Sequence, residues 1–142
     1  MASGMYTTGV VQFLNGDIAW DTSTFKCMLV TSSYTYDPDH DDRADVTNEI
    51  TNTGYTAGGN SVTTSAATAD DANNEAEADA TDVTFTSLAA GDQPAAAIVY
   101  LTTGVAANDI LISYNELTTP PAPDGNNYII QWAAEGVFKI AV

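Results

Sequence analysis

Alternate carboxylates in one polar segment are the clearest candidate for chemistry in this sequence. Asp37, Asp39 and Asp41 recur at every second residue, and in an extended loop such side chains can converge on one hard cation, which prefers oxygen ligands. The helix-loop-helix calcium pattern also requires a glycine and a glutamate further along, and neither stands at its position when counted from Asp37. The segment therefore predicts either a calcium or magnesium site or a surface loop whose carboxylates hold Arg43.

Residues for nucleophilic catalysis are scarce. His40 is the only histidine, and hydrolysis by a serine or cysteine needs such a base beside the nucleophile. Cys27 is the only cysteine, which excludes an intrachain disulfide, and its apolar neighbours favour the role of a small buried hydrophobe. Carboxylates beside Trp20 or Trp132 could serve a glycosidase, but no spacing singles out a pair. We therefore predict a protein that is not an enzyme and needs no cofactor beyond the cation considered above.

The charge balance restricts the partners. The chain has nineteen acidic side chains against three Lys and Arg residues, which gives a formal net charge of −16 over 142 residues. Nucleic acid is bound by neutralising its phosphates with Lys and Arg. We therefore expect no nucleic acid and no membrane among the partners. Such acidity is typical of a soluble surface that repels its own copies, and it also suits cation binding or a high-salt habitat.

The segments that must position these residues follow a β pattern. Within residues 25–31, Phe25, Cys27 and Leu29 fall on one side, and Met28 and Val30 fall on the other, as in an interior strand. Further strands are expected at residues 81–87, 95–102, 110–115, 127–133 and 136–142, the last two as an antiparallel hairpin around 134–136. The set predicts a single all-β domain over residues 1–142, either an antiparallel β-sandwich or a jelly roll.

Three segments depart from this pattern. Residues 3–14 have apolar side chains at helical spacing and favour a short N-terminal helix with Ser3 as its cap. Asn15-Gly16 would end that helix, although the same pair suits a tight turn equally well. Residues 32–53 and 57–80 are expected to be long loops, because the first is rich in charge and the second is poor in large hydrophobic side chains.

Several short motifs follow one another along the chain. They are GDIAWDTSTFKCMLVTSSYT (residues 16–35), the acidic loop at 37–45, NEI (48–50), GYTAGG (54–59), DVTF (82–85), AIVY (97–100) and GVFK (136–139). In this order they resemble a family of small tailed-bacteriophage virion structural proteins. The resemblance spans nearly the whole chain and departs from the family in the alanine-rich, acidic residues 66–80. It implies a capsid decoration or cement protein on the outer surface of the head.

Such a protein would be synthesised in the host cytoplasm and would bind the major capsid protein and further copies of itself, most simply as a trimer. Its contacts should use the less charged stretches, because like charges repel across a subunit boundary. The expected apolar anchors are Phe13, Leu14, Trp20 and Tyr114. The alternative is a tail or head-fibre module that binds host glycans through exposed tyrosines such as Tyr34 and Tyr36, and no residue in the sequence decides between the two.

Overall fold

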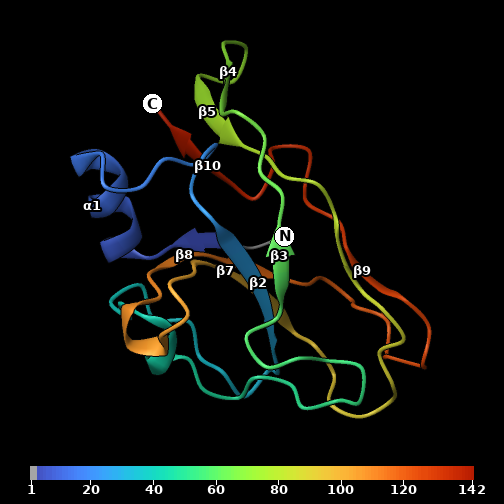
Figure 1. The fold of residues 1–142 in the computed structure, drawn as a ribbon. Coiled ribbons are helices and arrows are strands. Elements are labelled where there is room, and N and C mark those ends of the chain that lie inside the picture. Colours follow the sequence, from blue (N-terminus) through green and yellow to red (C-terminus); the bar gives the residue numbers. More distant parts are fainter. Residues whose placement is uncertain (1–2) are drawn as a thin grey trace.

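The chain forms a β-rich fold with one short α-helix, as its sequence predicts (Figure 1). The structure is a computed structural model and describes residues 3–142. Helix α1 spans Thr7–Asn15, and short 3-10 turns lie at Arg43–Asp45 and Ala106–Asn108. The strands are β1 (Ser3–Met5), β2 (Phe25–Val30), β3 (Asn60–Val62), β4 (Thr68–Asp70), β5 (Glu75–Ala78), β6 (Val83–Phe85), β7 (Ala96–Leu101), β8 (Leu111–Glu116), β9 (Tyr128–Ile130) and β10 (Phe138–Ala141). Within the described range, no helix is long and apolar enough to cross a membrane.

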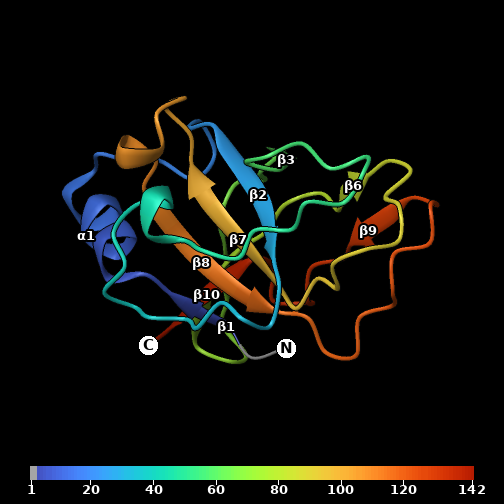
Figure 2. The same cartoon turned by 90° about the horizontal axis from the view of Figure 1, so that it is seen from below.

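Antiparallel pairing joins these strands into three sheets. The largest has the order β1-β8-β7-β2-β3, and the two smaller sheets are β10-β5-β4 and β6-β9. Side chains of β5, β6, β9 and β10 share one core with side chains of β2, β7 and β8, so both small sheets cover the same face of the large one. The fold is therefore all-β and sandwich-like. Helix α1 and the β6-β9 pair lie at opposite ends of the large sheet (Figures 1 and 2).

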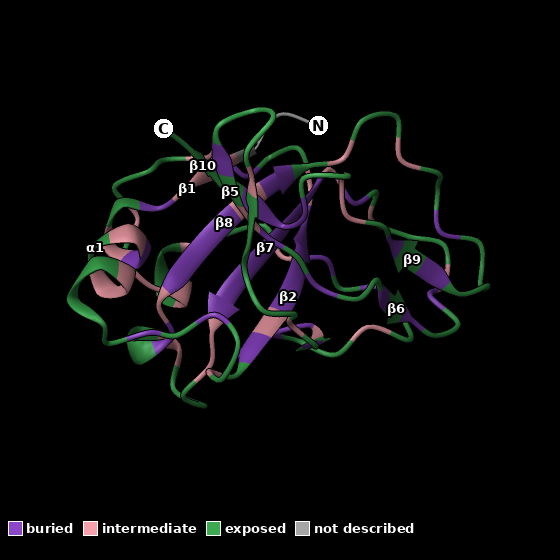
Figure 3. Ribbon diagram, turned by 90° about the horizontal axis from the view of Figure 1, so that it is seen from above, coloured by how far each residue is buried: buried purple, intermediate pink, exposed green. Residues whose placement is uncertain are grey.

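Strand β2 lies inside the large sheet and is buried on both faces. Phe25, Cys27 and Leu29 enter the core beneath the small sheets, whereas Met28 and Val30 enter a second core on the opposite face. This confirms the two-sided pattern predicted from the sequence. Figure 3 shows that β7, beside it, and β8, the next strand in the sheet, are mostly buried as well, because segments outside the sheet cover both of its faces.

The second core is closed by the polar segment predicted to be a loop at residues 32–53. Tyr34 in this segment is 5 % exposed, and its hydroxyl oxygen lies 3.0 Å from that of Tyr6 and 2.9 Å from Nδ1 of His40. The contact with Tyr6 therefore holds the segment against the residue that joins β1 to α1, and His40 binds the same Tyr34 hydroxyl from within the segment. Residues 32–53 contain one 3-10 turn and no strand, as expected from their charge and turn residues.

The predicted helix over residues 3–14 is wrong at its beginning. Ser3–Met5 form β1, which pairs with the edge of β8. The helix begins only at Thr7, with Tyr6 as an N-cap whose side chain makes no capping hydrogen bond. Pairing with a sheet edge gives this extended backbone hydrogen-bond partners. Gly16 ends the helix in the left-handed conformation, with φ of 78°, so the predicted boundary is confirmed.

The segment at residues 57–80 is not one long loop. It contains β3, β4 and β5, and the β4-β5 hairpin projects from the body of the molecule (Figure 1). Alanine and glutamate form strands poorly, but β5 pairs with β10 along its full length. Phe138 and Ile140 of β10 stand opposite Ala78 and Ala76, so the large side chains that stabilise this sheet come from the end of the chain.

The hairpin predicted between residues 127–133 and 136–142 is also wrong. A tight turn does join them, with a bridge between Ala133 and Gly136, but β9 pairs with β6 and β10 pairs with β5. After the turn, the Val137 N–H donates to the carbonyl of Ala78. The strand that follows therefore joins a different sheet, where Phe138 reaches the core.

Candidate functional site

The three-stranded sheet β10-β5-β4 has one acidic face and one apolar face. Side chains alternate along a strand, and residues opposite each other on paired strands share a face. The Glu-Ala-Glu-Ala sequence of β5 therefore divides the sheet. Its register places Thr68, Asp70, Glu75, Glu77 and Lys139 on one face, and Ala69, Ala76, Ala78, Phe138 and Ile140 on the other.

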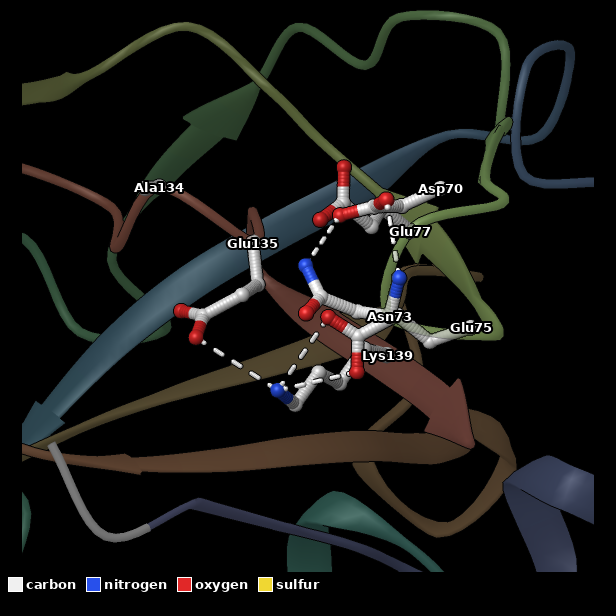
Figure 4. A pocket seen from close by; sticks show the side chains of 7 residues that line it. All are labelled: Asp70, Asn73, Glu75, Glu77, Ala134, Glu135 and Lys139. Atoms are coloured by element: carbon white, nitrogen blue, oxygen red, sulfur yellow. Dashed lines mark hydrogen bonds and ion pairs between the residues drawn. The ribbon is translucent and has the colours of Figure 1, made fainter. Parts of the chain in front are cut away.

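The acidic face surrounds Lys139 (Figure 4). Its ammonium nitrogen lies 3.0 Å from Oε2 of Glu75 and 3.4 Å from Oε1 of Glu135. The hydrogen bond with Glu75 raises the pKa of Lys139, and Glu135 adds to the effect. Glu75 is 8 % exposed, so Lys139 supplies the positive charge that this nearly buried carboxylate requires.

Three carboxylates on this face are close enough to share a cation. Asp70, Glu75 and Glu77 each offer an oxygen within 4.8 Å of the others, and no other group of three potential metal ligands in residues 3–142 meets that condition. Asp70 is already engaged, because it accepts hydrogen bonds from the side chain and backbone of Asn73, which lower its pKa. Lys139 adds a positive charge to this face. The arrangement is therefore a charge-paired network in which the ammonium group takes the place that a metal ion would have.

The cation site predicted at Asp37, Asp39 and Asp41 has a different local structure. All three side chains are exposed, and their oxygens do not gather as those of the acidic face do. Asp37 accepts a hydrogen bond from the backbone N–H of Asp39, and Asp41 accepts one from the hydroxyl of Thr8. Arg43 pairs with Asp109 from outside the loop, and not with the loop carboxylates as the sequence suggested.

His40 and Cys27, the two residues considered for nucleophilic chemistry, both have surroundings that favour a structural role. Nδ1 of His40 is bonded to Tyr34, as described above. Cys27 is fully buried in the sheet, and burial raises the pKa of its thiol. A thiol in that state is a poor nucleophile, which agrees with the small buried hydrophobe expected from the sequence.

The apolar face of the sheet opens into a groove of about 160 Å³. Trp20 and Phe138 form its floor, with ring centroids 5.0 Å apart in an edge-to-face contact. Phe13 of α1 packs on Phe138 at 5.7 Å. The residues that line the groove are Phe13, Trp20, Ala67, Ala76, Glu77, Ala78, Phe138 and Ile140. We call it the apolar groove. Its exposed lining surface is apolar throughout, and it can therefore bind an apolar group but cannot perform acid-base chemistry.

The four predicted apolar anchors do not all lie on one surface. Phe13 and Trp20 line the apolar groove, although Trp20 is only 6 % exposed and belongs to the core. Leu14 follows on α1 and is 80 % exposed. Ile140, at 49 % exposure, was not among the expected anchors, because a strand pattern alone does not show which of its residues stay uncovered.

Tyr114 lies on another surface. It belongs to β8 and contacts the second core, where its ring stacks on Tyr36 with centroids 4.9 Å apart. It therefore takes no part in the apolar groove.

Comparison with known proteins yields no relative of this chain. No protein-family model matches it, and neither a curated protein nor a solved structure is significantly similar to it.

Proposed function

We propose that this chain is a non-catalytic structural protein of a tailed-phage virion, a capsid decoration or cement protein on the outer surface of the head. Its partners would be the major capsid protein and further copies of the chain, assembled as a trimer. The order of motifs along the sequence supports the virion class. The apolar groove supports a role that depends on contact and not on reaction.

The apolar groove is the observation that carries this function. A chain with a net charge of −16 has ample polar side chains for its surface, yet the groove leaves aromatic and aliphatic groups open. Leu14 and Ile140 add exposed apolar area on α1 and β10. Open apolar patches with polar surroundings mark interaction sites, and burial of such a patch between subunits stabilises a shell without any chemical step.

The cations of the chain also favour a protein partner over nucleic acid. Arg43 Nε lies 2.8 Å from a carboxylate oxygen of Asp109, and Lys139 is paired with Glu75. Two of the three cationic side chains in the sequence are thus engaged within the chain. Phosphate binding needs several free cations on one surface, whereas an outward-facing capsid subunit needs none.

The glycan-binding alternative loses its proposed contacts. Tyr34 is buried, with its hydroxyl bonded to Tyr6 and His40, and Tyr36 donates its hydroxyl to the carbonyl of Met5 at 2.8 Å. The expectation that these tyrosines are exposed is wrong for Tyr34 and only partly right for Tyr36. We therefore do not retain this alternative.

Reconstitution on undecorated phage shells tests the proposed function. Purified chain should bind to shells that lack it and should raise the temperature at which they release DNA, because buried contacts across capsomer boundaries oppose their separation. Ile140→Asp should weaken the binding, because it places a charge in the apolar groove. Absence of binding by the unaltered chain would exclude a decoration role.

Ile129→Asp is the matched control. Ile129 lies on β9, at the opposite end of the large sheet from α1 (Figure 2), and its exposure of 52 % resembles the 49 % of Ile140. Both substitutions add one charge to an exposed isoleucine in a strand. Only the substitution in the apolar groove should reduce shell binding.

A further inference from the structure

We propose that the apolar groove receives one large apolar side chain from a partner segment in which lysine or arginine flanks that side chain. For the identity of the partner, a protein of the phage shell, this inference rests on the proposed function. The chemistry of the partner segment follows from the size and the charge of the groove.

The size of the apolar groove sets the number of anchors. Its volume is about 160 Å³, which is below the range of about 300–1,000 Å³ typical of small-molecule sites. One leucine or phenylalanine side chain is an occupant of suitable size. Trp20, Phe138 and Ile140, which all line the groove, would contact the inserted group.

The charges around the apolar groove determine which residues should flank the inserted apolar side chain in the partner segment. Asp21 follows Trp20 in sequence, and Asp79 follows Ala78 and accepts the indole N–H of Trp20 at its carbonyl, so two acidic residues adjoin the lining of the groove. Asp21 and Asp79 are both exposed. Lys139 projects from the opposite face of the sheet, where Glu75 and Glu135 already pair with it. A segment that enters the groove therefore passes acidic groups, and basic neighbours complement them.

The same charges disfavour a second copy as the occupant. Each copy carries a net charge of −16, and none of the three cations in the sequence lines the apolar groove. Two such surfaces would bring carboxylates together at the rim, where repulsion falls only when salt screens it. A basic segment gains from the rim charges that a second copy would oppose.

Labelled peptides test this inference with the intact chain. The probe is a seven-residue peptide with one central phenylalanine and lysines on both sides, and fluorescence anisotropy measures its Kd. We expect it to bind about tenfold more tightly than a peptide with glutamates in place of the lysines. Replacing the central phenylalanine by alanine should abolish binding. The preference for lysine should shrink as NaCl rises from about 0.05 M to about 0.5 M, because salt screens exposed charges.

Two variants assign the binding to the apolar groove. Ile140→Asp should weaken peptide binding at least about tenfold, the factor that corresponds to 1.4 kcal/mol, whereas Ile129→Asp should leave it unchanged. Asp21→Asn should narrow the difference between the affinities of the lysine and glutamate peptides, because it removes one charge beside the groove. Equal binding of the two peptides, absence of binding by both, or equal effects of the two isoleucine variants would overturn the inference.

The outcomes separate this inference from the proposed function. Peptide binding without shell binding would support the proposed chemistry of the groove and contradict a phage shell protein as its partner. If the Ile140→Asp variant still binds shells as well as the unaltered chain, the decoration role would stand, but the groove would not be the surface that contacts the shell. Self-association that Ile140→Asp abolishes, measured by sedimentation, would assign the groove to a second copy and overturn the basic partner.

Discussion

The guanidinium of Arg43 and the carboxylate of Asp109 form an ion pair that fastens the acidic loop to the connection before β8. Nε of Arg43 lies 2.8 Å from Oδ2 of Asp109, which is 1 % exposed. Oδ1 of the same carboxylate accepts hydrogen bonds from the backbone and hydroxyl of Thr103. The pair therefore joins the acidic loop to both ends of the β7–β8 connection, which is distant from that loop in sequence.

Arg43→Met should destabilise the fold, because it leaves the buried Asp109 without its counter-charge. We expect a loss of about 3 kcal/mol in the free energy of unfolding, measured by urea denaturation at neutral pH. Lys26→Met is the control, because Lys26 is a partly exposed cation in β2 for which the structure shows no ion pair among residues 3–142. Equal losses in the two variants would contradict a specific role for the pair.

The stability that Asp109 contributes should disappear in acid. Burial alone would raise the pKa of Asp109, but hydrogen bonds from Thr103 and Arg43 outweigh burial and lower it. A carboxylate with a lowered pKa in the folded state stabilises the fold above its unfolded pKa of about 3.9, and this stability is lost as the pH falls through the folded value. The difference in unfolding free energy between the unaltered chain and Asp109→Asn should therefore shrink between about pH 5 and pH 2. A constant difference would contradict this assignment.

Tyr128→Phe should leave the fold as stable as before or stabilise it by about 1 kcal/mol. The hydroxyl of Tyr128 is buried without a hydrogen-bond partner in the described structure, and its burial raises the pKa. Removing an unpaired buried hydroxyl removes its desolvation cost.

Tyr100→Phe is the matched control for Tyr128→Phe. Its hydroxyl donates to the carbonyl of Gly58 at 2.6 Å, and burial raises its pKa to about 12. This substitution should cost about 1–2 kcal/mol, because it leaves a buried carbonyl unpaired. Thermal unfolding of both variants measures their stabilities. A larger loss of stability in Tyr128→Phe than in Tyr100→Phe would contradict the hydrogen-bond assignment.

Local patterns were sufficient to predict the three central strands of the large sheet, β2, β7 and β8. The alternation in β2 depends only on neighbouring residues, and it placed Cys27 and Met28 on the correct opposite faces. The end of α1 at Gly16 could be predicted for the same reason, because a glycine stops a helix through its own backbone. The partner of each strand could not be predicted, since pairing depends on segments far away in sequence.

The candidate site depends on that long-range pairing. Alanine and glutamate in β5 indicate no strand by themselves, and only the register with Ile140 of β10 creates an acidic and an apolar face. Asp70, Glu75 and Glu77 likewise come together only when β4 and β5 pair. Phe13 was expected as an apolar anchor, but its contact with Phe138 follows from the fold alone.

Lys139→Met should destabilise the β10-β5-β4 sheet, and low salt should increase the loss. The substitution keeps the aliphatic length of the side chain but leaves Glu75, Glu135 and the neighbouring carboxylates without a cation, and their mutual repulsion is screened as ionic strength rises. Thermal unfolding at low and at high NaCl should show a larger difference from the unaltered chain at low salt. A difference independent of salt would indicate lost packing instead of lost charge pairing.

Gly59→Ala should prevent stable folding, whereas Gly104→Ala should be tolerated. Both glycines have positive φ, 73° and 87°, so an alanine at either position pays about 1–2 kcal/mol of backbone strain. A Cβ at Gly59 would also overlap the carbonyl of Cys27 in β2, whereas a Cβ at Gly104 has no neighbour within 4 Å. The neighbour of Gly59 is backbone inside the large sheet and cannot move aside, so the loss there should exceed about 4 kcal/mol. Soluble yield and urea denaturation of the two variants measure the difference, and similar stabilities would show that β2 and β3 do not approach each other at this point.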